Sequence, residues 1–396
     1  MKKTGVILGA GIIGSAIAYE LSRRNIASLA VLDADLEGSL SSSEPNAGGV
    51  RHLWNQPINR ELSRLSIDFF SRHATELGFQ KSGYLWLFSK EKESAANQLH
   101  QSVTAQGLSY EKLFPDEIKK KYPFLDKLDD VSLALFGSKD GLINSNALKQ
   151  FFQKEAKKKA CEFWDGTWVE KIEKKGNGYQ VFYRKVSKDQ ALQQLESPQF
   201  SNSKLESIEA DFVVLALGAW SKPFFSEIQL KSYSTPVRRQ ICFFKSEQFD
   251  MSPYGMVVDT SGVYFHPEGG NILAGFVVKE ESEGFKFHMD PDFFENYIWP
   301  PLFERSSFME RLKPLNGWGG LYSYTTDTTG ILGSIKDYPN LYEAHSFTGH
   351  GLMQSYGAAV CLSDLILNGK FDTIEATCLN RDRFTTGKLL PEGLHI

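Results

Sequence analysis

The sequence predicts an α/β fold that opens with a Rossmann-like strand–helix–strand unit, and three observations support this prediction. Residues 5–8 and 29–33 are short apolar runs typical of buried strands. Residues 15–24 between them repeat apolar side chains every four positions, as one face of a helix does. The turn that joins the first strand to the helix carries glycines at positions 9, 11 and 14.

Each part of this unit has a physical role in binding a dinucleotide. Gly9 permits the tight turn, Gly11 lets the backbone approach a pyrophosphate, and Gly14 lets the helix pack closely on the strand. The helix N-terminus directs free N–H groups and its positive dipole end at the phosphates. Asp33 ends the second strand, where a carboxylate accepts hydrogen bonds from ribose hydroxyls. The alternative is that the glycines serve packing alone. The expected dinucleotide contacts are Gly9, Gly11, Ile12, Ile13, Gly14, Asp33 and Ala34.

The glycine fingerprint does not choose between NAD and FAD, but three later segments favour a long, extended cofactor. A loop of small residues at 41–51 offers hydroxyl and N–H groups to a further phosphate or a ring edge. A strand at 210–217 runs into another glycine turn, and a final helix at about 352–367 ends at Gly369. The expected further contacts are Ser42, Ser43, Ala47, Gly48, Gly49, Val50, Leu217, Gly218, Trp220, Gly349, His350, Gly351, Leu352 and Met353.

Composition and charge exclude several other classes of protein. With 396 residues, 41% hydrophobic and 23% charged side chains, and a mean hydropathy of −0.30, the chain is neither disordered nor collagenous. Its length predicts two or three domains, or two that are interleaved. The net charge of −4 disfavours nucleic acid as a partner. The cysteines lack CxxC spacing, so we expect neither a metal site nor a disulfide framework; they are Cys161, Cys242, Cys361 and Cys378.

The N-terminus imitates a signal peptide, because Met1-Lys2-Lys3 precedes an apolar run from Val6 to Ala18. The glycine spacing and the helical periodicity that follows it favour the nucleotide-binding interpretation. No run of about 18 or more apolar residues occurs. We therefore expect a cytoplasmic protein without a membrane span.

Motifs spread over nearly the whole chain resemble the DAO, or amino-acid oxidase, family of FAD-dependent oxidoreductases. The Tyr322-Ser323-Tyr324 and Thr348–Leu352 phrases are most similar to sarcosine-oxidase-like members, including the FAD-dependent proteins associated with respiratory complex I assembly. The most specific motif is the phrase from Asn340 to Gly351, which stands directly before the final helix. The motifs that carry the resemblance are the fingerprint 9–33, the loop 42–51, the strand and turn 213–220, and the segments 263–269, 320–330 and 340–351.

The resemblance implies a Rossmann-like FAD-binding domain of the glutathione-reductase type, interleaved with an antiparallel-sheet substrate domain. It implies that Val169 meets the adenine. It also implies that backbone N–H groups of Gly349 and Gly351 reach the flavin pyrimidine edge, with His350 acting through its backbone rather than its imidazole. The expected FAD-binding domain combines residues 1–80, 141–220 and 320–396, and the expected substrate domain combines 81–140 and 221–319.

Departures from the family pattern bear on the chemistry. The glycine oxidase type has a carboxylate-binding arginine at the position of Tyr322. Monomeric sarcosine oxidase resembles this chain in having a tyrosine there. Gly320 stands where that oxidase has the cysteine that binds flavin covalently, so we expect noncovalent FAD. Met353 replaces a lysine that helps to hold the substrate carboxylate. No lysine lies near Leu273, where the lysine associated with oxygen reduction is expected, and this favours a dehydrogenase over an oxidase.

Arginines remain as candidate anchors for a substrate carboxylate, because the planar guanidinium matches a carboxylate bidentately. Arg51 follows the glycine loop closely enough to reach the flavin, the alternative being a surface or phosphate contact. The pair Arg238-Arg239 is the other candidate. Tyr264 and His266 share one side of an expected strand that lines either a pocket or a packed sheet face. The candidate catalytic residues are Tyr322, Arg51, His266 and Tyr264.

Residues 185–209 form a long polar connection, which we expect to be a mobile loop or a surface for a partner. The leading hypothesis is an FAD-dependent enzyme that oxidises the C–N bond of a small amine or of an N-substituted or D-amino acid, by hydride transfer to flavin N5. Its electron acceptor would be a quinone or oxygen. The alternative is a flavin-stabilised assembly or interaction protein with little or no turnover. An NAD-dependent dehydrogenase is disfavoured by the C-terminal motifs.

Overall fold

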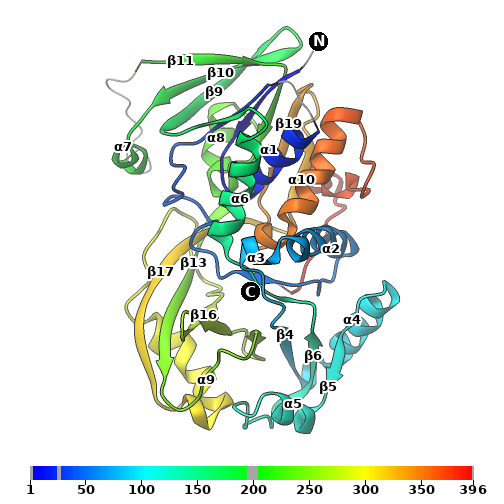
Figure 1. Ribbon diagram of the computed structural model, residues 1–396, viewed down its shortest axis with the longest axis vertical. Coiled ribbons are helices and arrows are strands. Elements are labelled where there is room, and N and C mark those ends of the chain that lie inside the picture. Colours follow the sequence, from blue (N-terminus) through cyan, green and yellow to red (C-terminus); the bar gives the residue numbers. More distant parts are fainter. Residues whose placement is uncertain (1–2, 25–27, 194–203, 395–396) are drawn as a thin grey trace.

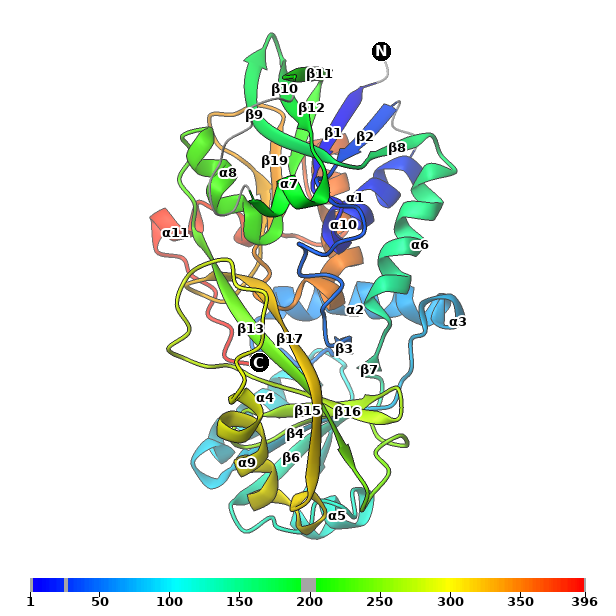
Figure 2. The same cartoon turned by 90° about the vertical axis from the view of Figure 1, so that its left-hand side faces the viewer.

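The computed structural model describes residues 3–24, 28–193 and 204–394, and it has two parts stacked along its longest axis (Figure 1). One part is built around a six-stranded sheet and contains the N-terminal unit, and the other is built around an eight-stranded sheet. Two long strands, β13 (Ser234–Ser246) and β17 (Leu312–Thr325), rise from the second part toward the first (Figure 2).

The six-stranded sheet joins strands from widely separated segments of the chain. Its neighbouring strands are parallel, except that β18 pairs antiparallel with β19. Both faces of the sheet are covered, which explains why its strands are continuous apolar runs rather than alternating ones. In spatial order the strands are β18 (Ile331–Ser334), β19 (Leu341–His345), β12 (Phe212–Leu215), β1 (Thr4–Leu8), β2 (Ser28–Leu32) and β8 (Cys161–Trp164).

Helices cover one face of this sheet and share a hydrophobic core with it. Helix α1 (Ile12–Arg23) begins directly after the glycine turn and packs between α6 (Ser145–Lys157) and α10 (Gly351–Asn368), as Figure 1 shows. Helix α10 ends at Gly369, whose φ of 72° lies in the left-handed region that glycine adopts without strain. Helix α2 (Pro57–Arg72) packs on α10 from the side of the second part.

A three-stranded antiparallel sheet and helix α8 (Ser221–Glu227) cover the other face. Tyr179, Val181 and Tyr183 alternate along β10 (Gly178–Lys185) and face the buried side chains of β1 and β12. The first part is therefore three layers deep, with the parallel sheet in the middle.

The connection at 185–209, expected to be a mobile loop or a surface for a partner, contains a helix and a strand among its described residues. Helix α7 (Lys188–Gln193) begins with a reciprocal cap, in which Ser187 Oγ accepts from the Gln190 N–H and Gln190 Oε1 accepts from the Ser187 N–H. Strand β11 (Glu206–Ala210) then pairs with β10 at the sheet edge, which is why its side chains are polar. Residues 194–203, including Ser197, Pro198 and Ser201, lie outside the described residues.

The eight-stranded sheet forms the second part. All its pairs are antiparallel, except that β14 runs parallel to β4. One face packs with α5 and α9 in a hydrophobic core, and the other face is directed at the first part. In spatial order the strands are β17, β13, β16 (Asn271–Phe276), β15 (Tyr264–Glu268), β14 (Met256–Val258), β4 (Tyr84–Ser89), β6 (Val131–Gly137) and β5 (Glu111–Leu113).

Shorter elements complete the described chain. Strand β3 (Gly49–Val50) pairs with β7 (Gly141–Leu142) where the two parts meet. The remaining elements are α3 (Ala74–Leu77), α4 (Glu93–Ala105), α5 (Pro115–Lys121), β9 (Thr167–Lys175), a π-helix at Phe294–Ile298, α9 (Trp299–Arg305), α11 (Arg383–Thr386), and single 3-10 turns at Lys90–Lys92, Gly218–Trp220, Ser307–Met309 and Thr377–Leu379.

The proposed division of the chain into two discontinuous domains needs adjustment at two boundaries. One, at residues 319 and 320, divides strand β17 of the eight-stranded sheet. Phe224 and Phe225 of α8 are buried in the core shared with β1 and β12. A boundary at residues 220 and 221 would separate this helix from the sheet that it covers. We therefore propose that the FAD-binding part continues through α8.

Candidate active site

A cavity of about 840 Å³ lies where the two parts of the molecule meet. It opens at the carboxyl ends of β1, β2, β12 and β19, the edge at which open α/β sheets bind ligands. Residues from the glycine turn, from β17 and from the start of α10 converge on it, although the glycine turn is more than 300 positions from the other two in the sequence. An elongated ligand of dinucleotide size is the natural occupant of such a cavity.

The glycine turn forms a cradle that larger residues would fill. A Cβ atom on Gly14 would lie 1.9 Å from the carbonyl oxygen of Gly9, so helix and turn touch backbone to backbone. Gly9 itself has a φ of 99°. No side chain caps α1 at Gly11, while Ser43 Oγ accepts a 3.0 Å hydrogen bond from the Ile12 N–H. The N-terminus of α1 therefore presents donors and a positive dipole end to a phosphate.

The carboxylate of Asp33 braces this turn and also lines the cavity. Its Oδ2 accepts from the Ala10 N–H at 2.6 Å, and its Oδ1 accepts from the Asp35 N–H at 2.9 Å. Each oxygen keeps a lone pair for a ribose hydroxyl. Burial, opposed by these two hydrogen bonds, raises the pKa of Asp33 to about 6.

This pKa predicts that the affinity for a dinucleotide falls on acidification. Ribose hydroxyls donate more strongly to a carboxylate than to a carboxylic acid, so affinity should drop as pH falls through about 6 and Asp33 takes up a proton. Dissociation constants of FAD measured by fluorescence between pH 5 and 8 test this. Asp33→Asn should bind more weakly and lose most of this pH dependence. An equally steep pH dependence in Asp33→Asn would assign it to another group.

Another part of the cavity wall is formed by the turn before α10. Ser346 and Thr348 have φ values of 60° and 46°, a conformation that is costly for residues other than glycine and that clusters at functional sites. Gly349 has a φ of 84°, and a Cβ there would lie 2.4 Å from the ring of Tyr322. The turn thus holds its backbone against Tyr322 at the N-terminus of a long helix.

The predicted cofactor contacts are distributed unequally around the cavity. Those that line it are Gly9, Gly11, Ile12, Ile13, Asp33, Ala34, Ser42, Ser43, Val169, Leu217, Gly218, Trp220, Gly349, Gly351 and Leu352. Gly14 does not line the cavity but supports the turn through its close contact with the backbone of Gly9. His350 packs on Trp54 at a ring distance of 4.4 Å and Met353 lies in the core, neither lining the cavity. The loop lines it as far as Asn46, and contacts from Ala47, Gly48, Gly49 and Val50 stay a proposal.

Sequence reasoning missed a buried polar chain in the cavity wall. His345 Nε2 lies 3.0 Å from Glu343 Oε2, and His345 Nδ1 lies 2.5 Å from Ser346 Oγ, which in turn lies 2.7 Å from Ser323 Oγ. Arg381 donates to the other oxygen of Glu343 at 2.7 Å. The available signal was the pair Glu343 and His345 on one face of an otherwise apolar strand.

Tyr84 and Tyr264 belong to the largely apolar face of the eight-stranded sheet that is directed at the first part. As predicted, Tyr264 and His266 share one side of β15, while Phe265 enters the opposite core. Burial raises the pKa values of Tyr84, Tyr264 and Tyr322, so all three stay protonated hydrogen-bond donors at neutral pH. Of the candidate catalytic residues, Tyr322 alone lines the cavity itself.

His266 is buried on this face and is uncharged at neutral pH. Burial lowers the pKa of His266 to about 4, and this effect outweighs the hydrogen bonds with the backbone of Pro267 and Ala47, which raise the pKa. Its Nδ1 lies 2.9 Å from the Pro267 carbonyl oxygen, which requires that Nδ1 carries the proton. The imidazole is therefore a weak base.

The three candidate arginine anchors lie in different surroundings. Arg51 is 1% exposed, with its guanidinium 3.6 Å from the ring centre of Trp54, and it donates to the carbonyl oxygens of Leu53 and Leu394. Arg238 is engaged by Glu281 at 3.0 Å and Asp290 at 2.6 Å, which removes it as an anchor. Arg239 lies on the opposite side of β13, with its guanidinium 5.3 Å from the ring centre of Tyr322.

Comparison with known protein families identifies the fold and the cofactor. The model of the family described as DAO, FAD dependent oxidoreductase, matches residues 6–365. The chain belongs to this family. The DAO family is FAD-dependent, and the cradle around Gly14, the free N–H groups at α1 and the carboxylate of Asp33 fit that cofactor. Its α/β fold confirms the fold class predicted from the sequence.

Relatives of this DAO-family chain include several oxidoreductases. FAD-dependent oxidoreductase domain-containing protein 1 of Xenopus laevis is 28% identical, covering 98% of this chain and 83% of that protein. Monomeric sarcosine oxidase of Bacillus sp. (strain B-0618) is 22% identical, covering 92% of both chains. Among solved structures, L-proline dehydrogenase from P. horikoshii aligns with a TM-score of 0.83 at 22% identity, covering 98% of this chain and 99% of that chain. Glycine oxidase from Geobacillus kaustophilus aligns with a TM-score of 0.77 at 18% identity, covering all of both chains.

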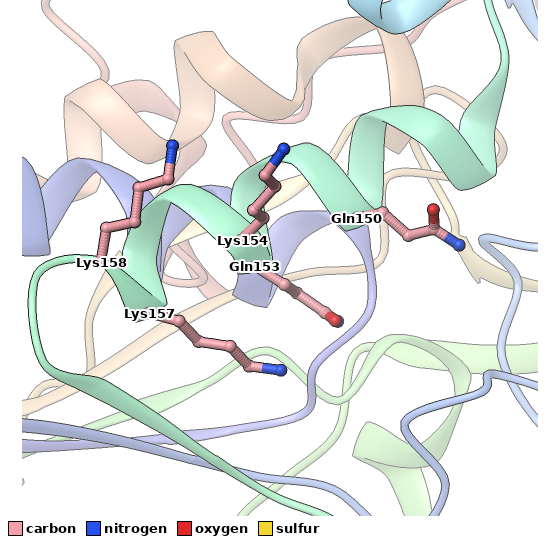
Figure 3. Close-up of a pocket in the computed structure, with 5 residues that line it drawn as sticks. All are labelled: Gln150, Gln153, Lys154, Lys157 and Lys158. Atoms are coloured by element: carbon pink, nitrogen blue, oxygen red, sulfur yellow. The ribbon is translucent and has the colours of Figure 1, made fainter.

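Other features of this DAO-family chain do not compete with the cavity as a site. A hollow of about 570 Å³ on α6 is lined by Gln150, Gln153, Lys154, Lys157 and Lys158 (Figure 3). These side chains come from one helix and its lysines are exposed, so no groups converge on a ligand there. Within the described ranges we find no helix long and apolar enough to cross a membrane, and no cluster of residues suited to hold a metal.

Proposed function

We propose that this DAO-family protein oxidises the C–N bond of a small amine that carries a carboxylate, such as an N-substituted or D-amino acid. The observation that carries the proposal is the sheet face beside Tyr322, with the buried guanidiniums of Arg51 and Arg239 above it. Buried cations need a counter-charge, and a substrate carboxylate supplies one. Sarcosine oxidase, glycine oxidase and L-proline dehydrogenase among the similar proteins are named for substrates of this kind.

In this proposal the protein orients the substrate and excludes water, and bound FAD supplies the hydride acceptor for the C–N oxidation. Arg51 binds the carboxylate, while the hydroxyl groups of Tyr264 and Tyr322 donate hydrogen bonds at its side. His266 is neutral, so it does not repel an amine that arrives as ammonium. Backbone donors at Gly349 and Gly351, with the dipole of α10, would stabilise the negative charge that bound flavin gains on reduction.

Anaerobic titration of the FAD-bound protein with a panel of amines and amino acids tests the proposal. Bleaching of the flavin absorbance by an N-methyl or D-amino acid supports it and excludes a purely structural role for FAD. Bleaching by none of them, with the protein folded and loaded, would contradict it and favour the assembly or interaction role.

We predict that FAD is bound noncovalently at the position suggested by the family pattern. Gly320 has no side chain to form a covalent bond, and it lies on β17 near Pro45, where a Cβ would be 3.4 Å from the proline ring. Acid precipitation should therefore release the yellow colour into the supernatant. Colour retained in the pellet would show covalent attachment elsewhere.

We also predict that reduced flavin reacts slowly with oxygen, so that a dehydrogenase is slightly favoured over an oxidase. Leu273 is 3% exposed and packs in the apolar part of the sheet face, where it brings no positive charge to stabilise reduced oxygen. Stopped-flow measurements should show faster reoxidation by a quinone or dye than by air. Rapid reoxidation by air would reverse this assignment.

A further inference from the structure

Arg51 and Arg239 differ from the other buried arginines of the described chain. Among the described residues, neither has a carboxylate oxygen within 4 Å, and the Nε of each has no hydrogen-bond partner. Arg60 also lacks an acid, but its guanidinium is satisfied by the neutral oxygens of four residues. The buried arginines with carboxylate partners at 2.5 to 2.7 Å are Arg238, Arg305, Arg381 and Arg383.

Uncharged residues of β17 surround the guanidinium of Arg239. Its cross-strand neighbour on β17 is Gly320, which has no side chain. The rings of Tyr322 and Tyr324 lie 5.3 Å and 6.0 Å from its Cζ, and one of its NH groups donates to the Arg238 carbonyl at 3.0 Å. The side chain is thus fixed in place on the sheet face that carries Tyr322, with its Nε lacking a partner in the part of the chain that the structure describes.

The two guanidiniums approach this face from different sides. Arg51 lies over Trp86 of β4, at 4.8 Å from the ring centre, whereas Arg239 belongs to β13. Three strands, β14, β15 and β16, separate β4 from β13 in the sheet. The tyrosines between them are neutral at physiological pH, and no carboxylate of the described residues forms an ion pair with either arginine. The acids that act on Arg51, Glu392 and Asp140, do so from a longer distance.

We propose that the substrate carries two anionic groups, one held by Arg51 and the other by Arg239. The substrate class is then an amine with two carboxylates, such as an N-substituted amino dicarboxylic acid, with its nitrogen over the tyrosines. This inference rests on the proposed function for the class of reaction. The positive charges of both arginines act on Tyr322 and oppose the rise of its pKa on burial, as expected if all three surround one ligand.

Binding of unreactive acids to the FAD-bound protein tests the two-anion site without turnover. Succinate and butyrate have the same carbon chain and differ by one carboxylate, and binding is followed by the change in flavin absorbance. Because each bidentate contact with a charged group is strong, we expect succinate to bind at least about tenfold more tightly. Equal affinities for the two acids would overturn the proposal.

Substitutions assign the second carboxylate to Arg239. Arg239→Gln should weaken succinate binding by about tenfold and butyrate binding by less than about twofold, and Arg239→Lys should recover part of the loss. Arg238→Gln is the matched control on the opposite face of the strand, and it should keep the preference for succinate. If Arg239→Gln weakened the binding of succinate and butyrate equally, the assignment would be overturned. If Arg239→Gln does not fold, the same comparison of the two acids in Arg239→Lys tests the assignment.

Turnover separates this inference from the proposed function. N-Methylaspartate should bleach the flavin at lower concentration than N-methylalanine, which lacks the second carboxylate. Bleaching by N-methylalanine with no preference for succinate would refute the two-anion site and leave amine oxidation standing. A preference for succinate with no bleaching by either amine would refute amine oxidation and leave the two-anion site standing.

Discussion

Gly14→Val is expected to abolish FAD binding and to lower the melting temperature. A Cβ atom at this position would lie 1.9 Å from the carbonyl oxygen of Gly9 and 3.0 Å from its carbon. Both neighbours are backbone atoms, so no rotamer change relieves the clash, and α1 must move away from the turn. The N–H groups that bind the pyrophosphate then move with it.

The size of the effect follows from two contributions. Forcing extra carbon atoms into a packed contact costs about 1 to 3 kcal/mol, and loss of bound FAD removes about 2.7 kcal/mol when the cofactor is present at 100 times its dissociation constant. The ratio of flavin to protein absorbance measures the loss of FAD. Melting curves recorded with and without FAD measure the loss of stability. Full flavin content in Gly14→Val would contradict the assignment of the turn.

Gly11→Ala provides a matched comparison within the same turn. Its Cβ would meet only Ser43 Oγ, at 3.1 Å, and a hydroxyl group can rotate away. We expect reduced FAD affinity from the disturbed Ile12 hydrogen bond, with a melting temperature close to that of the unsubstituted protein. The contrast between the two glycines distinguishes backbone packing from phosphate approach.

The N-terminal unit was predictable because its structure depends on neighbouring residues. The strand expected at 5–8 is β1, Thr4–Leu8, and the helix expected at 15–24 is α1, Ile12–Arg23. The helix starts earlier than its apolar periodicity indicates, because the carbonyl oxygen of the N-cap residue Gly11 accepts the first helical hydrogen bond, from the Ser15 N–H. The helix expected at 352–367 is α10, Gly351–Asn368, which is one residue longer at each end.

The substrate side was less predictable because it depends on pairing between distant strands. The sequence alone does not distinguish Arg238 from Arg239, because both are arginines in the same strand. They lie on opposite faces of β13, so Arg238 pairs with an acid and Arg239 lies near the ring of Tyr322. Arg51 is held partly by Leu394, at the other end of the described chain. Contacts across such separations leave no periodic signal in the sequence.

Arg51→Ala is expected to weaken binding of a carboxylate-bearing substrate by about 2 to 5 kcal/mol, the range found when one member of a buried charge pair is removed. The substrate carboxylate would then be desolvated without a partner. Tyr322→Phe should weaken turnover only modestly, because it removes one neutral hydroxyl contact. Ligand-induced changes in flavin absorbance measure the binding of each variant.

Folding and binding must be separated in this test, because Arg51 also supports the structure. Its removal leaves the carbonyl groups of Leu53 and Leu394 without their donor and opens space beside Trp54. Arg51→Lys retains the charge but loses the planar fork, so it should restore stability better than it restores affinity. If Arg51→Ala melts at a lower temperature yet binds the carboxylate unchanged, Arg51 is structural. The anchor is then Arg239, since Arg238 is already paired with acids.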